Sequence, residues 1–210
     1  MRINLIEILL SLPAVFLAIT FHEFAHAYSA HRLGDPTPKN LGRLTLDPLA
    51  HVDWLGFIMF ALFGFGWAKP VQVNPSNFKN KRMGNIIVSF AGPAANMILA
   101  VITIIILILI QLFVNDLGIL WNIVNRVIYL NIVFAILNLI PIPPFDGYRI
   151  VRELFYRKNI RFFWNYERYG LLVLFIFIFL GLFDIIVGIP ANLIYTRLMR
   201  LQGYVLFLLQ

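Results

Sequence analysis

The sequence predicts an all-α membrane protein that crosses the bilayer several times. Of its 210 residues, 60% are hydrophobic and 13% are charged, and the mean hydropathy is +0.83. A typical soluble domain carries roughly twice that charged fraction. Four apolar stretches are long enough to span a bilayer as helices, and we expect them to form one membrane domain over residues 1–210: residues 3–31, 86–114, 117–140 and 170–189.

The basic residues indicate how the chain is threaded. The sequence has 17 Lys and Arg against 10 Asp and Glu, and the basic ones gather within residues 32–82 and 146–168. Such loops stay on the cytoplasmic side, so the N-terminus and the turn at 115–118 are expected outside. Arg197 and Arg200 then fall outside against the rule, which leaves the position of the C-terminus open. The basic residues do not alternate with base-stacking aromatics, so we expect no nucleic-acid partner.

Two shorter segments follow the first apolar stretch. Residues 54–67 are apolar but include three glycines, and about 14 residues are too few for an ordinary span. This favours a re-entrant or interfacial piece, with a fifth full span as the alternative. Residues 68–75 alternate in character between prolines and predict a short edge strand, a β-like segment that could pair with an extended peptide.

The strongest chemical pattern is His22-Glu23-Phe24-Ala25-His26, deep in the first apolar stretch. The chain has no cysteine, so a transition-metal site must use His, Asp or Glu. Residues four apart lie on one helix face, about 6 Å apart along the axis, so both imidazoles can bind one ion. Glu23, beside the first ligand, can reach a metal-bound water and accept its proton.

The depth of this pattern in the membrane adds weight to it. His22 lies nine residues before His31, or about 14 Å from the cytoplasmic end of the helix. A charged side chain near the bilayer centre costs at least about 3 kcal/mol. Two histidines and a glutamate there indicate a bound ion or a polar cavity, and a hydrogen-bonded polar cluster between helices is the alternative. Reading the stretch as a cleaved signal peptide, the other alternative, would discard the motif.

A third ligand must come from another part of the chain, and Asp146 is the strongest candidate. It follows three prolines that stop the third long span and precedes Gly147, which permits a sharp turn. Irregular backbone of this kind is tolerated at membrane depth where it is buried in protein or lines a wet cavity. His31 and His51 are rival ligands, but His31 points away from His26 on a regular helix, and His51 is expected to be a surface-loop residue.

Three places together resemble the site-2 protease family of intramembrane metallopeptidases, in its compact prokaryotic form without PDZ or CBS modules. They are the strings at 22–26, 92–96 (Gly-Pro-Ala-Ala-Asn) and 138–147, which ends in Asp-Gly. The resemblance implies a three-helix catalytic core over about residues 3–149, with the span at about 170–189 as an addition. It implies that His22, His26 and Asp146 bind zinc and that Glu23 is the general base. Asn138 is implied as a further catalytic residue that, with Asn96, lines the site; helix packing is the alternative for both amides.

The function implied by this resemblance is intramembrane zinc-dependent endopeptidase activity. The substrates would be membrane proteins cleaved in or near a transmembrane segment, and the protein would lie in a prokaryotic cytoplasmic membrane with its active site toward the cytoplasm. A membrane metal or ion transporter is the alternative, because intramembrane His, Glu and Asp also mark ion pathways. A catalytically inactive scaffold is a third hypothesis, although it would be expected to have lost Glu23 or a ligand.

Two further charges lie within predicted spans, Arg126 in the third and Asp184 in the fourth. In the expected threading both fall toward the outer half of the membrane. Pairing would reduce the cost of burying them, so we predict an ion pair between them. Separate snorkelling of each side chain to the surface is the alternative.

Overall fold

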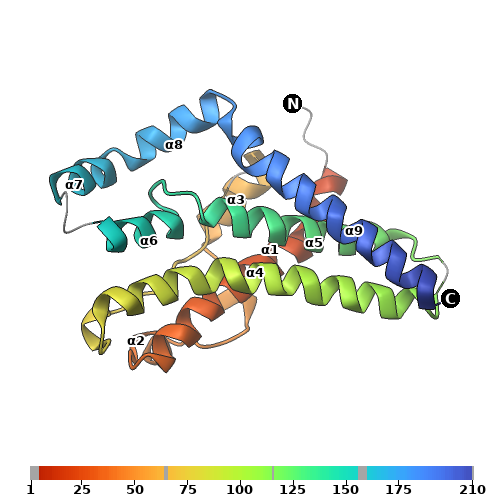
Figure 1. Cartoon of the computed structure of the whole chain (residues 1–210), viewed down its shortest axis with the longest axis horizontal. Coiled ribbons are helices and arrows are strands. Elements are labelled where there is room, and N and C mark those ends of the chain that lie inside the picture. The colour runs from red at the N-terminus through yellow and green to blue at the C-terminus, as the bar shows by residue number, and fades with distance from the viewer. Residues whose placement is uncertain (1–4, 64–65, 115, 156–159, 210) are drawn as a thin grey trace.

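The protein is a bundle of helices, seen in a computed structural model that describes residues 5–63, 66–114, 116–155 and 160–209 (Figure 1). In chain order its α-helices are α1 (Leu5–Arg32), α2 (Thr37–Asn40), α3 (Trp54–Phe63), α4 (Lys81–Gln111), α5 (Ile119–Asn138), α6 (Asp146–Phe155), α7 (Ile160–Arg168), α8 (Gly170–Phe179) and α9 (Ile189–Leu209). Shorter turns of helix lie at Pro48–Ala50 and Pro75–Asn77, which are 3-10, and at Asp184–Gly188, which is π-helical.

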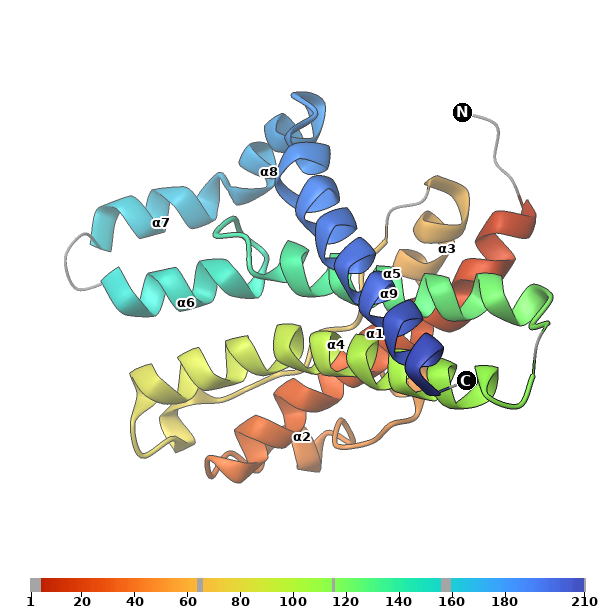
Figure 2. The ribbon, with the colours of Figure 1, turned by 45° about the vertical axis from the view of Figure 1, so that its right-hand side comes forward.

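Three long helices, α1, α4 and α5, contact one another and form the centre of the bundle (Figures 1 and 2). Helix α9 packs across α4 and α5, where small residues such as Ala100 and Ala191 are fully buried. Helices in lipid associate largely through such close packing. The opposite face of α4 exposes large aliphatic side chains, including Ile98 and Ile105. Apolar side chains all round a helix suit one placed between protein and lipid.

The three long predicted spans are confirmed, because α1, α4 and α5 each have the length and apolarity to cross a membrane. The fourth predicted stretch, 170–189, is not one continuous helix. Helix α8 ends at Phe179, and Gly181 follows with φ +69°, a left-handed conformation that turns the chain back toward the bundle. Helices α7 and α8 together have the apolarity of a fourth span, but they are bent by 60°.

The two segments between α1 and α4 are short structural pieces. Helix α3 has ten residues, about 15 Å, against a hydrocarbon core of about 30 Å, so it is not a full span. The predicted strand at 68–75 is wrong: among the described residues it makes a single bridge, between Val52 and Ala68. Lys69 N–H donates to the His51 carbonyl, and later amides bind side chains instead of a neighbouring strand.

The predicted ion pair between Arg126 and Asp184 is also wrong. Arg126 donates to the Glu7 carboxylate and, at 2.9 Å, to the Ser11 hydroxyl. Glu7 and Ser11 lie one turn apart on α1, which packs directly against α5. The charge inside the span is therefore compensated by the neighbouring core helix.

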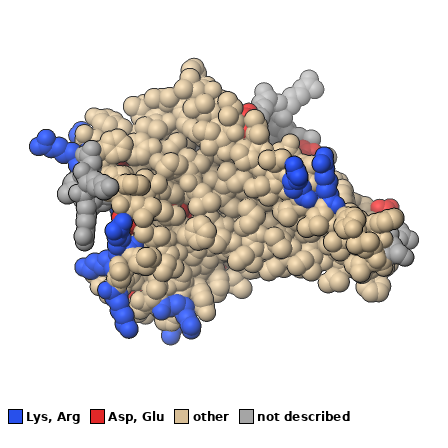
Figure 3. All heavy atoms as spheres, viewed as in Figure 1, with Lys and Arg blue, Asp and Glu red and all other residues tan. Residues whose placement is uncertain are grey.

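Lys and Arg side chains gather at the end of the molecule where α2, α6 and α7 lie (Figure 3). Two more stand over α9, the helix that carries Arg197 and Arg200 (Figure 3). Helices α1 and α4 extend from the basic end across the molecule (Figure 1). The larger basic end brings together residues from the two basic regions of the sequence.

Asp35 joins the end of α1 to the segment before α4. Its carboxylate accepts hydrogen bonds from the amide and hydroxyl of Thr37, from the amide of Asn74 at 2.7 Å and from the side chain of Asn77 at 2.7 Å. Burial alone would raise the pKa of Asp35, but these donors outweigh it and lower the pKa below its usual range. Asp35 is thus the common anchor of two loops.

Replacing Asp35 with Asn should therefore lower the stability of the folded protein. The new amide group would face the Asn74 N–H, and losing a buried hydrogen bond to a charged group costs roughly 1.5–3 kcal/mol. Because the folded-state pKa is depressed, the stabilisation is present above the unfolded pKa of about 3.9 and is lost as the pH falls through the folded pKa. Thermal unfolding in detergent at several pH values measures both effects.

Asp47→Asn is the matched control, since Asp47 is an exposed aspartate whose carboxylate accepts, among the described residues, a hydrogen bond only from the nearby Leu49 amide. An Asp35→Asn protein as stable as this control would contradict the assignment.

Candidate metal centre

Three donor atoms from two helices, α1 and α6, meet inside the bundle. The Nε2 atoms of His22 and His26 are 2.9 Å apart, and each is 3.1 Å from Oδ2 of Asp146. All three side chains are buried. Ligand atoms placed about 2.0–2.1 Å from one zinc ion at tetrahedral angles lie about 3.3 Å from each other. The spacing therefore fits a single metal ion.

In each imidazole ring, the hydrogen bond made by Nδ1, the nitrogen that faces away from Asp146, determines that Nε2 is free to bind a metal ion. Nδ1 of His22 lies 2.7 Å from Oδ1 of Asn96, and Nδ1 of His26 lies 2.7 Å from the Val88 carbonyl oxygen. Both oxygens are acceptors, so Nδ1 must carry the proton and each neutral ring presents an Nε2 lone pair. Two lone pairs and a carboxylate oxygen facing one another repel, and a cation between them removes the repulsion.

Asn96 is oriented by a second set of hydrogen bonds. Its amide nitrogen donates to the Ala18 carbonyl and to Oδ1 of Asn131, each at 2.9 Å. These two acceptors require the nitrogen on that side, so the Asn96 oxygen must face His22. Asn131 in turn donates to the Val127 carbonyl of its own helix. Sequence reasoning missed Asn131, although a polar residue in the middle of the α5 span was a usable signal.

Gly92 lets α4 approach the two histidines. A Cβ atom at this position would lie 2.6 Å from Nε2 of both His22 and His26, so only glycine leaves room for the imidazoles. Pro93 follows and has no N–H, which leaves the Ser89 carbonyl without its usual helical partner. The same stretch of α4 supplies the Val88 carbonyl that binds His26.

The Asp146 carboxylate is positioned by the break after α5. Helix α5 ends at Asn138, and Pro141, Pro143 and Pro144 prevent its continuation. Asp146 begins α6, next to Gly147, where a Cβ atom would lie 2.2 Å from the Leu139 carbonyl oxygen. The glycine allows the chain to fold tightly back, so that Asp146 faces the histidines of α1.

Glu23 lies beside this group without being part of it. It is buried, and its Oε2 accepts a 2.9 Å hydrogen bond from the backbone N–H of Val71. Within the described part of the chain, Oε1 has no hydrogen-bond partner. The loop after α3 therefore holds one carboxylate oxygen and leaves the other free.

The remaining candidates lie elsewhere. The Asn138 side chain is half-buried and donates to the Phe134 carbonyl one turn earlier; no described hydrogen bond joins it to the three donors. His31 is not part of the group of potential ligands. His51 is also outside the group, but the expectation of a surface position was wrong: it is fully buried and hydrogen-bonds the Thr45 carbonyl through Nε2.

These features define a class, a helical membrane protein with a buried His-His-Asp group suited to a metal ion. A profile of Peptidase family M50 matches residues 113–181, the part that includes Asp146. "Putative zinc metalloprotease YwhC" of Bacillus subtilis is 41% identical over 145 residues, 67% of this chain and 66% of that protein. "Putative zinc metalloprotease Rip2" of Mycolicibacterium smegmatis is 34% identical over 138 residues, 63% of this chain and 52% of that protein.

The chain belongs to peptidase family M50, the site-2 protease family. It spans just under two thirds of the length of the first relative and about half of the second. No solved structure matches it significantly.

Replacing Asn96 with Ala should weaken metal binding while leaving the three donors in place. His22 would lose the acceptor that holds its Nδ1 proton, and removing such an outer partner typically costs about 10–100-fold in metal affinity. Competition with a chelator of known affinity measures the change. Asn122→Ala is the control, because Asn122 lies on the exposed face of α5. Equal affinities for the two variants would rule out the orienting role of Asn96.

Proposed function

We propose that the chain is an intramembrane zinc endopeptidase that hydrolyses peptide bonds in or near transmembrane segments of membrane proteins. The observation that carries the proposal is the meeting of His22, His26 and Asp146 next to a glutamate that binds none of them. The relatives bear the name "putative zinc metalloprotease", which supports it.

Zinc suits this donor set, since catalytic zinc sites use three nitrogen or oxygen ligands and keep a fourth position open. When bound, zinc polarises the scissile carbonyl and lowers the pKa of a bound water to about 7. We assign His22, His26 and Asp146 as its ligands. The hydrogen bonds from the two Nδ1–H groups would keep both Nε2 atoms directed at the ion.

Glu23 would be the general base. Its free Oε1 would accept a proton from the attacking water as the water oxygen bonds to the carbonyl carbon. It would then return that proton to the amide nitrogen as the carbon–nitrogen bond breaks. The Val71 N–H on Oε2 would hold the carboxylate in place through both steps. Asn138, assigned by the family resemblance, would use its side-chain amide to hold the substrate backbone or the developing negative charge.

The substrate would have to unwind before it is cut. In a transmembrane helix each carbonyl is hydrogen-bonded within the segment, so a scissile bond must leave the helix to reach the three donors. Membrane proteins whose transmembrane segment is flexible or broken would therefore be the best substrates. The basic end in Figure 3 supports a site facing the cytoplasm, in a prokaryotic cytoplasmic membrane.

Purified protein should contain about one zinc ion per chain, and Asp146→Ala should lose it. Loss of a direct ligand should reduce affinity by more than the roughly 10–100-fold cost of losing an outer partner. Metal analysis by mass spectrometry measures the content. Asp184→Ala is the control, because Asp184 lies in the π-helical segment outside the donor group. Normal zinc in the Asp146 variant would refute its assignment as a ligand.

Glu23→Gln separates catalysis from metal binding. Zinc should stay bound because all three donors remain, while cleavage should fall about 10²–10⁴-fold with the loss of the general base. The measurement is paired zinc content and cleavage rate on a panel of single-span substrates in the same lipid. Unchanged cleavage would refute the role of Glu23, and lost zinc would make Glu23 a ligand.

A further inference from the structure

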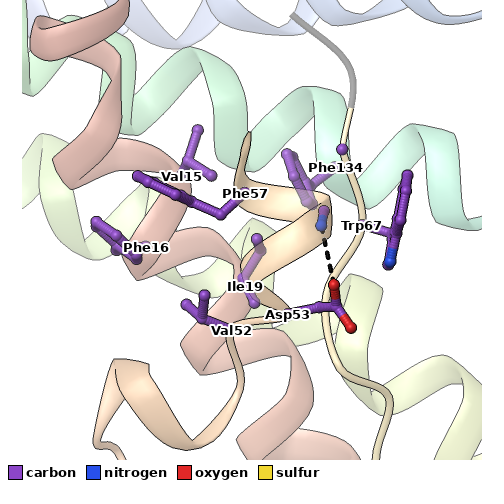
Figure 4. Close-up of a pocket in the computed structure, with 10 residues that line it drawn as sticks. Val15, Phe16, Ile19, Val52, Asp53, Phe57, Trp67 and Phe134 are labelled. Atoms are coloured by element: carbon purple, nitrogen blue, oxygen red, sulfur yellow. Dashed lines mark hydrogen bonds between the residues drawn. The ribbon is translucent and has the colours of Figure 1, made fainter. Parts of the chain in front are cut away.

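An apolar cavity of about 40 Å³ lies between α1, α3 and α5. Figure 4 shows its walls. They come from α1, α3 and α5, from Val52 and Asp53 before α3, and from Trp67 after it. Phe16 and Phe57 stack at 5.6 Å across the α1–α3 contact. The side chains that line the cavity from these elements are mainly aliphatic and aromatic: Val15, Phe16, Ile19, Val52, Phe57 and Phe134.

Three connections link the cavity to Glu23 and to the hydrogen bonds that orient His22. Ile19 lies one turn before Glu23 on the same face of α1, about 6 Å along the axis. Trp67 lines the cavity and begins the segment whose Val71 amide binds Glu23. Phe134 lies one turn after Asn131, which binds the amide that orients His22.

We propose that this cavity receives one small aliphatic side chain of the substrate, from a residue next to the bond that is cleaved. The inference rests on the proposed peptidase function and adds to it a preference for side-chain size. Adjacent Cα atoms are 3.8 Å apart, so a residue flanking a scissile bond near Glu23 can reach a cavity one helical turn away. In an extended peptide only alternate side chains face the same wall, so one position should dominate.

The volume of the cavity limits which side chains can fit into it. A cavity that binds a benzene ring measures about 150 Å³, so a cavity of about 40 Å³ holds only a few heavy atoms. That is enough for the methyl groups of Ala or Val and too little for a lipid chain or an aromatic ring. The wall is also held close: a Cβ atom on Gly56 would lie 2.1 Å from the Trp67 carbonyl oxygen, so α3 packs directly against the segment that leads to Glu23.

The test uses full-length protein and reporter substrates with one transmembrane segment. Each residue around the cleaved bond is changed in turn to Ala, Val, Leu or Phe, and the relative kcat/KM is measured. Wild-type protein should discriminate against Phe at one flanking position. Ile19→Ala enlarges the cavity and should shift the preference there toward larger side chains by about 10-fold or more, since each methylene in an apolar pocket is worth about that much.

Phe57→Leu enlarges the same cavity from the α3 side. It replaces the Ile19 variant in this test if that variant does not fold. Leu17→Ala removes a similar volume from the exposed face of α1 and should keep the wild-type preference. If both cavity variants retain zinc and cleavage and show the wild-type side-chain preference, the proposed side-chain pocket is refuted. The proposed peptidase function is not affected by that result. Wild-type protein that binds zinc but cleaves no substrate would instead overturn the proposed function.

Discussion

The close approach of α4 to α1 at Gly92 is the constraint on which the rest of the site depends. Two imidazoles one turn apart on α1 need space on the side they face, and a single methyl group at position 92 would occupy it. Once the helices are this close, the Val88 carbonyl and the Asn96 amide of α4 lie within hydrogen-bond distance of the outer nitrogens. The absence of a side chain at Gly92 thus sets the position of both imidazole rings and determines that Nδ1 carries the proton in each.

The polar groups around the site form a connected set because the surrounding span is apolar. An unpaired polar group in hydrocarbon costs several kcal/mol. The amides of Asn96 and Asn131 meet this demand by joining α1, α4 and α5 through specific atoms. Sliding one helix by a turn would leave these atoms unpaired. The network that orients His22 therefore also fixes the register of the three core helices, so stability and site geometry have a common origin.

The features predictable from sequence were those that follow from periodicity or from a single residue's geometry. The three long spans follow from their length and apolarity, and the meeting of His22 with His26 follows from a spacing of four. Asp146 could be expected to face them because prolines end α5 just before it. Asn131, whose Oδ1 accepts a hydrogen bond from the Asn96 amide, was missed because its role depends on which side of α5 faces α4.

Two wrong predictions, the Arg126–Asp184 pair and the strand at 68–75, share a different cause, because each depended on which surfaces of separate elements meet. Arg126 was assigned a partner by depth alone, yet Glu7 is closer because α5 packs on α1. The stretch at 170–189 was read as one helix by its apolarity, which carries no signal for the turn at Gly181. The segment at 68–75 has the pattern of a strand but no partner strand, and its amides bind Glu23 and Asp35 instead.

The hydrogen bonds that hold the two histidines and Glu23 bear on the choice between a peptidase and a transporter. An ion in transit needs ligands that can release it, and side chains that rotate freely serve that purpose. Here both imidazoles are held through Nδ1, and the acceptor of one is itself held by two further bonds. Such restraint favours an ion that stays. Glu23 is held by a backbone amide beside the three donors without being one of them. The proposed peptidase would use such a carboxylate as its general base, whereas ion passage needs no base of this kind.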